Sequence, residues 1–145
     1  MNKEMKLSPH FTLGELTKTN HKTPDGNIPS RVAIENLRNI CENWLEPLRQ
    51  ARGPIVITSG YRSPEVNWLA GGSATSNHLT GCAVDIRVTG FEQAVRYASI
   101  LLDISDGTKR DYDELFIERN SAGRYWIHFA VRPKDNRRKT GFLKV

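Results

Sequence analysis

The sequence predicts an α+β domain with a small, mainly antiparallel sheet. Apolar residues recur at three- and four-residue steps between residues 31 and 48 and again between 91 and 102, which predicts two amphipathic helices. Short β-branched or aromatic runs, which predict strands, lie mostly in the second half of the chain. Because the main helical pattern comes first and strands dominate later, we expect helices to pack on one face of the sheet.

One domain is expected for a chain of 145 residues with 38% apolar and 26% charged side chains. No internal repeat, low-complexity segment or linker divides it. We expect the folded core to comprise roughly residues 8–131. Residues 132–145 carry much of the excess positive charge, and we expect them to form a basic tail in solvent.

The predicted helices of the first half have clear start signals. Thr12 followed by Glu15 is a capping-box pattern and predicts a short helix at that point. Ser30 is the expected N-cap of the long helix that follows, and Pro47 is expected to kink or end its last turn. We expect Trp44, on the apolar face of this helix, to pack inside the protein.

The second half is predicted to hold most of the sheet. Residues 54–58 and 82–88 are expected to be buried strands, and the runs 113–119 and 124–131 flank the turn sequence NSAG and predict a hairpin. A short helix is expected near residues 64–69, with Trp68 packed in the core or against a helix. The helix 91–102 is expected to direct these residues inward: Phe91, Ala94, Val95, Ala98, and Leu101 or Leu102.

Three polar residues interrupt apolar surroundings. Asp85 lies within the strand pattern CAVDIRV, and His128 lies within YWIHFAV. His78 precedes Gly81, whose flexible backbone can turn the chain into the Asp85 strand. Two imidazoles and a carboxylate are a common ligand set for catalytic zinc, with a fourth position left for water.

The segments around these residues carry a family resemblance. Residues 76–85 fit the pattern S-x-H-x-x-G-x-A-x-D, which resembles the zinc signature of the D-Ala-D-Ala carboxypeptidase-like metallopeptidases. The sequence WIH at 126–128 resembles the W-x-H that supplies the third ligand, and SGYRS at 59–63 resembles the segment whose arginine faces the substrate. The resemblance runs from about Phe11 to Val131, and FTLGELTK and PLRQARGPIVITSGYRS are similar to short, phage-associated members.

This resemblance implies a zinc peptidase that cleaves peptidoglycan stem peptides or cross-links, with its zinc site on one face of the sheet. His78, Asp85 and His128 would bind one Zn²⁺ ion, and Arg62 would stabilise the oxyanion of the reaction. Ser76 is expected to orient a ligand or the substrate, while Tyr61 and Trp126 are candidates to line the cleft. His10 and His21 lie in polar segments and are expected not to bind metal.

The general base is the point at which the chain departs from several relatives. They carry Glu three residues before the last histidine, where this chain has Tyr125. If residues 121–123 form a three-residue hairpin loop, Glu118 and Glu114 become diagonal neighbours of His128 on its own face, whereas a shift of one residue would remove them from it. We expect Glu118 to be the base, with Glu114 second and Asp113 third. A zinc-containing binding module without catalytic activity is the alternative.

The remaining features concern partners and cellular location. A net charge of +5 favours an anionic partner, which we expect to be the cell wall rather than nucleic acid. No apolar run is long enough to span a bilayer, and the two cysteines, Cys41 and Cys82, are expected to be buried free thiols. We see no signal peptide and expect a monomer that is made in the cytoplasm and acts on the wall after phage-type release.

Overall fold

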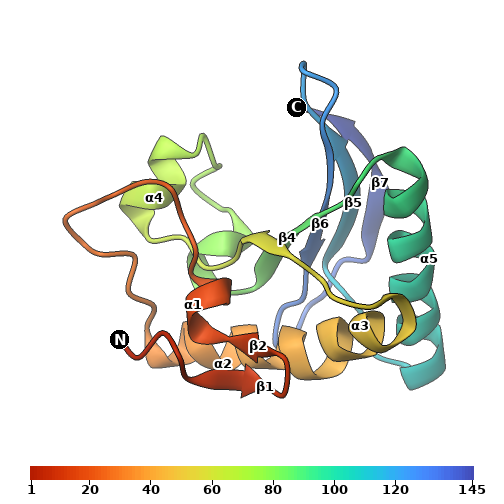
Figure 1. Cartoon of the computed structure of the whole chain (residues 1–145), viewed down its shortest axis with the longest axis horizontal. Coiled ribbons are helices and arrows are strands. Elements are labelled where there is room, and N and C mark those ends of the chain that lie inside the picture. Colours follow the sequence, from red (N-terminus) through yellow and green to blue (C-terminus); the bar gives the residue numbers. More distant parts are fainter.

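The computed structural model describes residues Met1–Val145, and a five-stranded sheet forms its centre (Figure 1). The strand order is β3–β4–β6–β5–β7, and every neighbouring pair is antiparallel except β5 and β7, which are parallel. The predicted α+β class with a mainly antiparallel sheet is therefore confirmed. The strands are β3 (Ile57–Ser59), β4 (Ala83–Arg87), β5 (Glu114–Arg119), β6 (Tyr125–Ala130) and β7 (Lys139–Lys144).

The helices lie beside and below this sheet (Figure 1). The consecutive elements α2, η1 and α3 (residues 31–52) form one helical rod that crosses the base of the molecule. Helix α5 (Phe91–Thr108) stands along one face of the strands. The first half also contains a two-stranded hairpin. None of the helices combines the length and the hydrophobicity of a membrane-spanning segment. The remaining elements are β1 (Lys6–Ser8), β2 (Phe11–Thr12), α1 (Leu13–Leu16), α2 (Arg31–Ile40), the π-helical turn η1 (Cys41–Leu45), α3 (Glu46–Arg52), α4 (Pro64–Leu69), the 3₁₀ turn η2 (Asn77–Thr80) and α5 (Phe91–Thr108).

The predicted helix starts are confirmed, but Pro47 does not end the helix. Thr12 and Glu15 form both arms of the capping box at α1, and Ser30 Oγ accepts a hydrogen bond from the backbone N–H of Ala33. The chain stays helical beyond Pro47 to Arg52, because this proline lies in the first turn of α3, where a missing N–H is tolerated. The π-helical turn η1 absorbs the irregularity one turn earlier.

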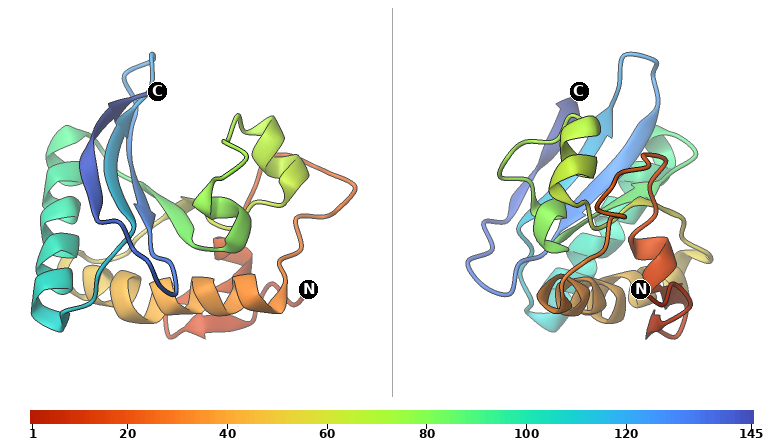
Figure 2. Two further views of the ribbon diagram at one scale, coloured as in Figure 1. Left: turned by 180° about the vertical axis from the view of Figure 1, so that it is seen from behind. Right: turned by 90° about the vertical axis from the view of Figure 1, so that its left-hand side faces the viewer.

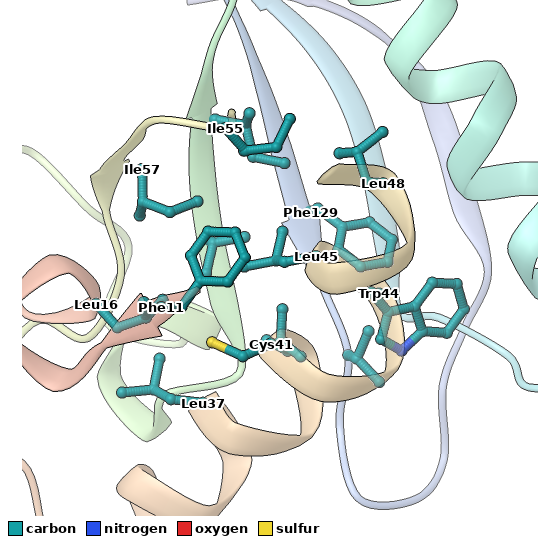
Figure 3. Close-up of a cluster of buried hydrophobic side chains, with 14 of the residues drawn as sticks. Phe11, Leu16, Leu37, Cys41, Trp44, Leu45, Leu48, Ile55, Ile57 and Phe129 are labelled. Atoms are coloured by element: carbon teal, nitrogen blue, oxygen red, sulfur yellow. The ribbon is translucent and has the colours of Figure 1, made fainter. Parts of the chain in front are cut away.

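The hydrophobic core joins the helical rod to the sheet (Figure 3). Trp44 is 1% exposed and packs with its ring centroid 5.0 Å from that of Phe129 on β6. Cys41 and Cys82 are buried free thiols, as expected. Trp68 is 78% exposed, so the prediction that it packs inside is wrong. Helix α4 buries Val66 and Asn67, and Trp68, two residues after Val66, points to the opposite side of the helix.

The predicted inner face of α5 is partly wrong. Ala94 and Leu101 are fully buried, but Phe91 is 46% and Val95 44% exposed. The buried stripe continues through Tyr97 instead, at three- and four-residue steps, and the helix runs on to Thr108. Phe91 begins the helix at the rim of the sheet, where its ring meets the edge of Tyr125 rather than the core.

The hairpin of β5 and β6 has the predicted register. Phe116 pairs with His128 and Glu118 pairs with Trp126, so both glutamates of β5 share the face of His128. The loop closes through a hydrogen bond from the N–H of Gly123 to the carbonyl of Asn120, with Gly123 at φ +82°. This left-handed position requires glycine and sets the register.

The C-terminal segment differs from the predicted solvated tail. Residues Lys139–Lys144 form β7, an edge strand parallel to β5, although its side chains are exposed. Its sequence, KTGFLK, lacks the alternation of a half-buried strand, so the pattern gave no signal. Backbone hydrogen bonds hold the segment, including one from Lys139 N–H to the carbonyl of Asp113.

Candidate metal centre and active-site cleft

The signature segment forms a cap, a 3₁₀ turn and a tight bend. Ser76 Oγ accepts a hydrogen bond from the backbone N–H of His78 and caps η2. Gly81 ends η2 at φ +73°, and a Cβ atom at this position would lie 2.4 Å from the carbonyl oxygen of Ala33 on α2. The serine and the glycine of the motif are therefore needed to present His78 and to start β4 close against α2.

The three predicted metal ligands come together on one side of the sheet. Asp85 on β4 and His128 on β6 are direct cross-strand partners on the face away from α5. His78 Nε2 lies 3.3 Å and His128 Nδ1 lies 3.2 Å from Oδ1 of Asp85. One donor atom from each residue lies within 4.8 Å of the others, so the three side chains converge on one point.

The outer nitrogen of each histidine ring is already engaged. His78 Nδ1 lies 2.7 Å from the carbonyl oxygen of Gly60, and His128 Nε2 lies 2.9 Å from Oε1 of Glu114. These contacts orient both rings so that their inner nitrogens face Asp85. Partners of this kind are characteristic of metal-ligating histidines, and a set of two imidazoles and one carboxylate fits a single zinc ion.

Gly60 is required for the His78 contact. A Cβ atom there would lie 2.1 Å from the carbonyl oxygen of Leu16. The glycine lets the chain after β3 approach α1, and this close approach places its carbonyl within hydrogen-bond distance of His78 Nδ1.

The ligand cluster shifts the pKa values of its own members. Burial alone would raise the pKa of Asp85, but the neighbouring His78 and His128 hold it well below its usual range. Burial alone would lower the pKa of His128, but hydrogen bonds to Asp85 and Glu114 raise it to about 10. Without metal, a proton on His128 therefore balances the carboxylates.

An open cleft of about 720 Å³ lies over this cluster. Its lining contains the loop that follows α4 on one side and residues of β5, β6 and β7 on the other. Figure 2 (left) shows α4 and this loop standing opposite the ends of these strands. A volume of this size lies within the range of ligand-binding clefts in proteins.

Arg62 lines the cleft beside Asp85, as predicted. Its Nη2 donates to Oδ2 of Asp85 at 3.2 Å, and its Nε donates to Oγ of Ser59 at 3.0 Å. The backbone N–H of Arg62 also donates to the carbonyl of His78. These contacts fix a guanidinium at the edge of the ligand cluster, where it can meet a developing negative charge.

The three candidate bases have different surroundings. Glu118 lines the cleft and accepts a hydrogen bond from Trp126 Nε1 at 3.0 Å, and burial raises its pKa. Glu114 also lines the cleft, but its hydrogen bond with His128 lowers its pKa. Asp113 is fully buried and does not line the cleft. Glu118 is therefore the carboxylate with the best environment for accepting a proton.

The structure also places the other predicted residues. Trp126 and Ser76 line the cleft, whereas Tyr61 is 8% exposed and belongs to the core. His10 pairs with Glu46 far from the cluster. Tyr125 points to the opposite face of β6 from His128 and contacts Phe91.

Three cleft residues were missed by sequence reasoning. Asn77 donates from Nδ2 to carboxylate oxygens of Asp113 and Glu114, both at 2.8 Å. Arg132 and Arg137 line the cleft and pair with Asp113. Asn77 occupies a variable position of the motif, and the two arginines lie in the segment predicted to be a solvated tail. Only a prediction that their acidic partner Asp113 is buried could have indicated these residues.

The comparison with known families agrees with this geometry. Residues 9–112 match the family described as Peptidase M15. The chain belongs to the peptidase M15 family. The match includes Arg62, His78 and Asp85 and ends before β5 and β6. The assignment of His128 to the candidate metal site of this M15 chain therefore depends on the structure and on the W-x-H pattern.

One curated relative matches part of this M15 chain. A zinc D-Ala-D-Ala carboxypeptidase from Streptomyces albus G is 32% identical over 80 residues. The alignment covers 53% of this chain and 31% of the relative, so the chain matches about a third of that protein's length.

Proposed function

We propose that this M15 family member is a zinc-dependent peptidase that hydrolyses peptide bonds of peptidoglycan. The observation that carries the proposal is the convergence of His78, Asp85 and His128 within 4.8 Å on the floor of an open cleft. Residues that served only stability would not be expected beside an open cleft with the outer nitrogen of each imidazole ring held by Gly60 or Glu114.

His78, Asp85 and His128 would hold one zinc ion, which supplies a Lewis acid that polarises the scissile carbonyl and activates water. Glu118 accepts the proton of the attacking water and passes it to the leaving amine. Its raised pKa favours the first step, because the carboxylate accepts a proton more readily. Arg62 places its guanidinium beside the cluster and neutralises negative charge that develops on the carbonyl oxygen.

The substrate class follows from the relative and from the cleft. The Streptomyces relative is named for D-Ala-D-Ala, and the cleft is open enough for a peptide that is still attached to a wall polymer. Carboxypeptidase or endopeptidase action on stem peptides or cross-links is therefore the proposed activity. A role as a phage endolysin, cytoplasmic synthesis followed by action on the wall, a monomeric state and the absence of nucleic-acid partners stay predictions from the sequence.

A second candidate is a zinc-containing module that binds wall peptide without cleaving it. The position of Tyr125 favours it, because the residue three before His128 carries no carboxylate and faces away from the cleft. The two candidates differ at Glu118, since a binding module does not need a base there.

The deciding experiment is mass spectrometry of muropeptides released from purified peptidoglycan of several wall types. We expect products that disappear with a zinc chelator, return with added zinc and are absent for His78→Ala. His21→Ala is the matched control, because His21 is exposed and lies outside the cluster. Peptide binding that depends on zinc without any product would support the binding module, and neither binding nor cleavage would refute both candidates.

A further inference from the structure

One buried carboxylate fixes two arginines at the side of the cleft. Asp113 is 0% exposed, and Arg137 grips it with Nε at 3.0 Å from Oδ1 and Nη2 at 2.7 Å from Oδ2. Arg132 Nε lies 3.3 Å from the same Oδ2 and donates to Oδ1 of Asn77 at 3.0 Å. Asp113 and Asn77 therefore fix both guanidinium groups on the side that faces the protein interior.

The outer edges of these guanidinium groups remain available. The guanidinium of Arg132 uses only Nε for hydrogen bonds within the protein, and that of Arg137 uses Nε and Nη2. Both Nη atoms of Arg132 and Nη1 of Arg137 can therefore donate to a ligand in the cleft. The two side chains are 32% and 40% exposed, and both line the cleft. Lys139 lines the same wall without an ion pair.

This pair lies one side chain away from the ligand cluster. Arg137 Nη2 is 3.7 Å from Oε2 of Glu114, and Oε1 of Glu114 contacts His128. Asn77, which holds Arg132, immediately precedes His78. A peptide bound over the cluster would therefore place its neighbouring groups against the arginines.

We propose that Arg132 and Arg137 form a carboxylate-binding subsite that selects peptides with a free carboxylate next to the scissile bond. This inference rests on the proposed function and adds a substrate class to it. Guanidinium donors match the two oxygens of a carboxylate, and side chains that are already fixed lose little conformational entropy on binding. The carboxylate has two possible sources in a stem peptide, namely its C-terminus or the free α-carboxylate of a γ-linked D-Glu.

The test compares two pairs of peptides on the full chain loaded with zinc. The first pair is diacetyl-L-Lys-D-Ala-D-Ala with a C-terminal acid or amide. The second is acetyl-L-Ala-γ-D-Glu-L-Lys and the same peptide with D-isoglutamine. We measure kcat/KM for cleavage and, by titration calorimetry, the affinity for each peptide, so that binding is recorded even without turnover.

We expect the acid of one pair to exceed its neutral partner by about 10–100-fold in affinity or kcat/KM. The pair that shows the preference identifies the source of the carboxylate. Arg132→Gln should lower the affinity and kcat/KM for the acid peptide to the values of its neutral partner, and it leaves the pairing of Arg137 with Asp113 intact. Lys134→Gln is the matched control, because it removes one positive charge from the same segment outside the cleft.

The possible outcomes separate this inference from the proposed function. Equal binding and cleavage of acid and neutral peptides would overturn the subsite while leaving the peptidase intact, and so would a preference that survives in Arg132→Gln. Binding that prefers the acid without cleavage would support the subsite and refute the peptidase. Absence of binding to all four peptides would overturn the subsite. Thermal unfolding of Arg132→Gln checks that a lost preference is not lost folding.

Discussion

Oε1 of Glu114 lies 2.9 Å from Nε2 of His128, on the side of the ring opposite the nitrogen that faces Asp85. This contact fixes the orientation of the ring and increases the basicity of its inner nitrogen. We therefore expect Glu114 to act as a positioning residue, although the sequence alone allowed it to be the general base.

Replacement of Glu114 tests this role. Glu114→Gln should weaken zinc binding by about 10–100-fold, because the carboxylate that supports His128 is lost. At saturating zinc, kcat should change much less than the affinity does. Competition with a chromogenic chelator measures the affinity. A large loss of kcat with unchanged zinc affinity would instead identify Glu114 as the base.

Glu118 should show the opposite pattern. Glu118→Gln keeps the shape of the side chain but cannot accept a proton, so we expect kcat to fall by about 10²–10⁴-fold with zinc affinity unchanged. Glu92→Gln, on the exposed surface of α5, serves as the control. If Glu118→Gln retained full activity, the base would have to be another group.

Zinc binding should release a proton from His128. Its pKa of about 10 in the metal-free protein means that the ring is charged at neutral pH, and zinc requires the neutral form. Between pH 7 and 9 the affinity for zinc should therefore rise by about tenfold per pH unit. Calorimetry in buffers with different ionisation enthalpies counts the protons. An affinity independent of pH would contradict the protonated state.

Gly81 should be essential for folding rather than for chemistry. Gly81→Ala places a side chain at φ +73° and against the backbone of Ala33, and the left-handed conformation alone costs about 1–3 kcal/mol. We expect a lower free energy of unfolding in urea and weaker zinc binding. Gly107→Ala is the control, because a Cβ there meets no atom within 4 Å. Equal stability of the two variants would show that α2 can move away.

Asp113 should make the protein sensitive to acid. Burial alone would raise its pKa, but hydrogen bonds from Arg137 and Asn77 hold the pKa well below its usual range. A folded-state pKa below the unfolded one stabilises the protein above about pH 4, and this contribution disappears as the pH falls toward the folded value.

Asp113→Asn should therefore remove part of the loss of stability at low pH. At pH 7 we expect the variant to be less stable by about 2 kcal/mol, a moderate figure because the partner arginines are partly exposed. Asp103→Asn on α5 is the control, since Asp103 makes no ion pair. Urea unfolding between pH 3 and 7 measures both effects. Parallel stability curves for the variant and the native chain would show that Asp113 is not the linked group.

Much of the fold was predictable from local sequence, and so was the convergence of two of the three candidate ligands. The capping box at Thr12, the N-cap at Ser30 and the Gly123 turn are decided by residues within one or two turns of each other, so a short window contains the cause. The hairpin register then places Glu118 on the face of His128. The spacing of His78, Gly81 and Asp85 likewise describes one continuous turn and strand.

Only the tertiary structure decided which groups support these residues. The carbonyl of Gly60 reaches His78 because the chain after β3 approaches α1. Glu114 contacts His128, whereas the carboxylate of Glu118, on the same face of β5, accepts a hydrogen bond from Trp126. The exposure of Phe91 and Trp68 likewise depends on which sides of α5 and α4 are covered by other elements.

The C-terminal segment shows this division most clearly. Its positive charges are visible in the sequence, but their partner Asp113 lies in another segment and is buried only when β5 forms. The sequence predicted the candidate ligands His78 and Asp85 from one local motif, and His128 from the separate W-x-H pattern. Tertiary structure determined the arginine-lined wall, because an ion pair between distant residues depends on packing that no local pattern records.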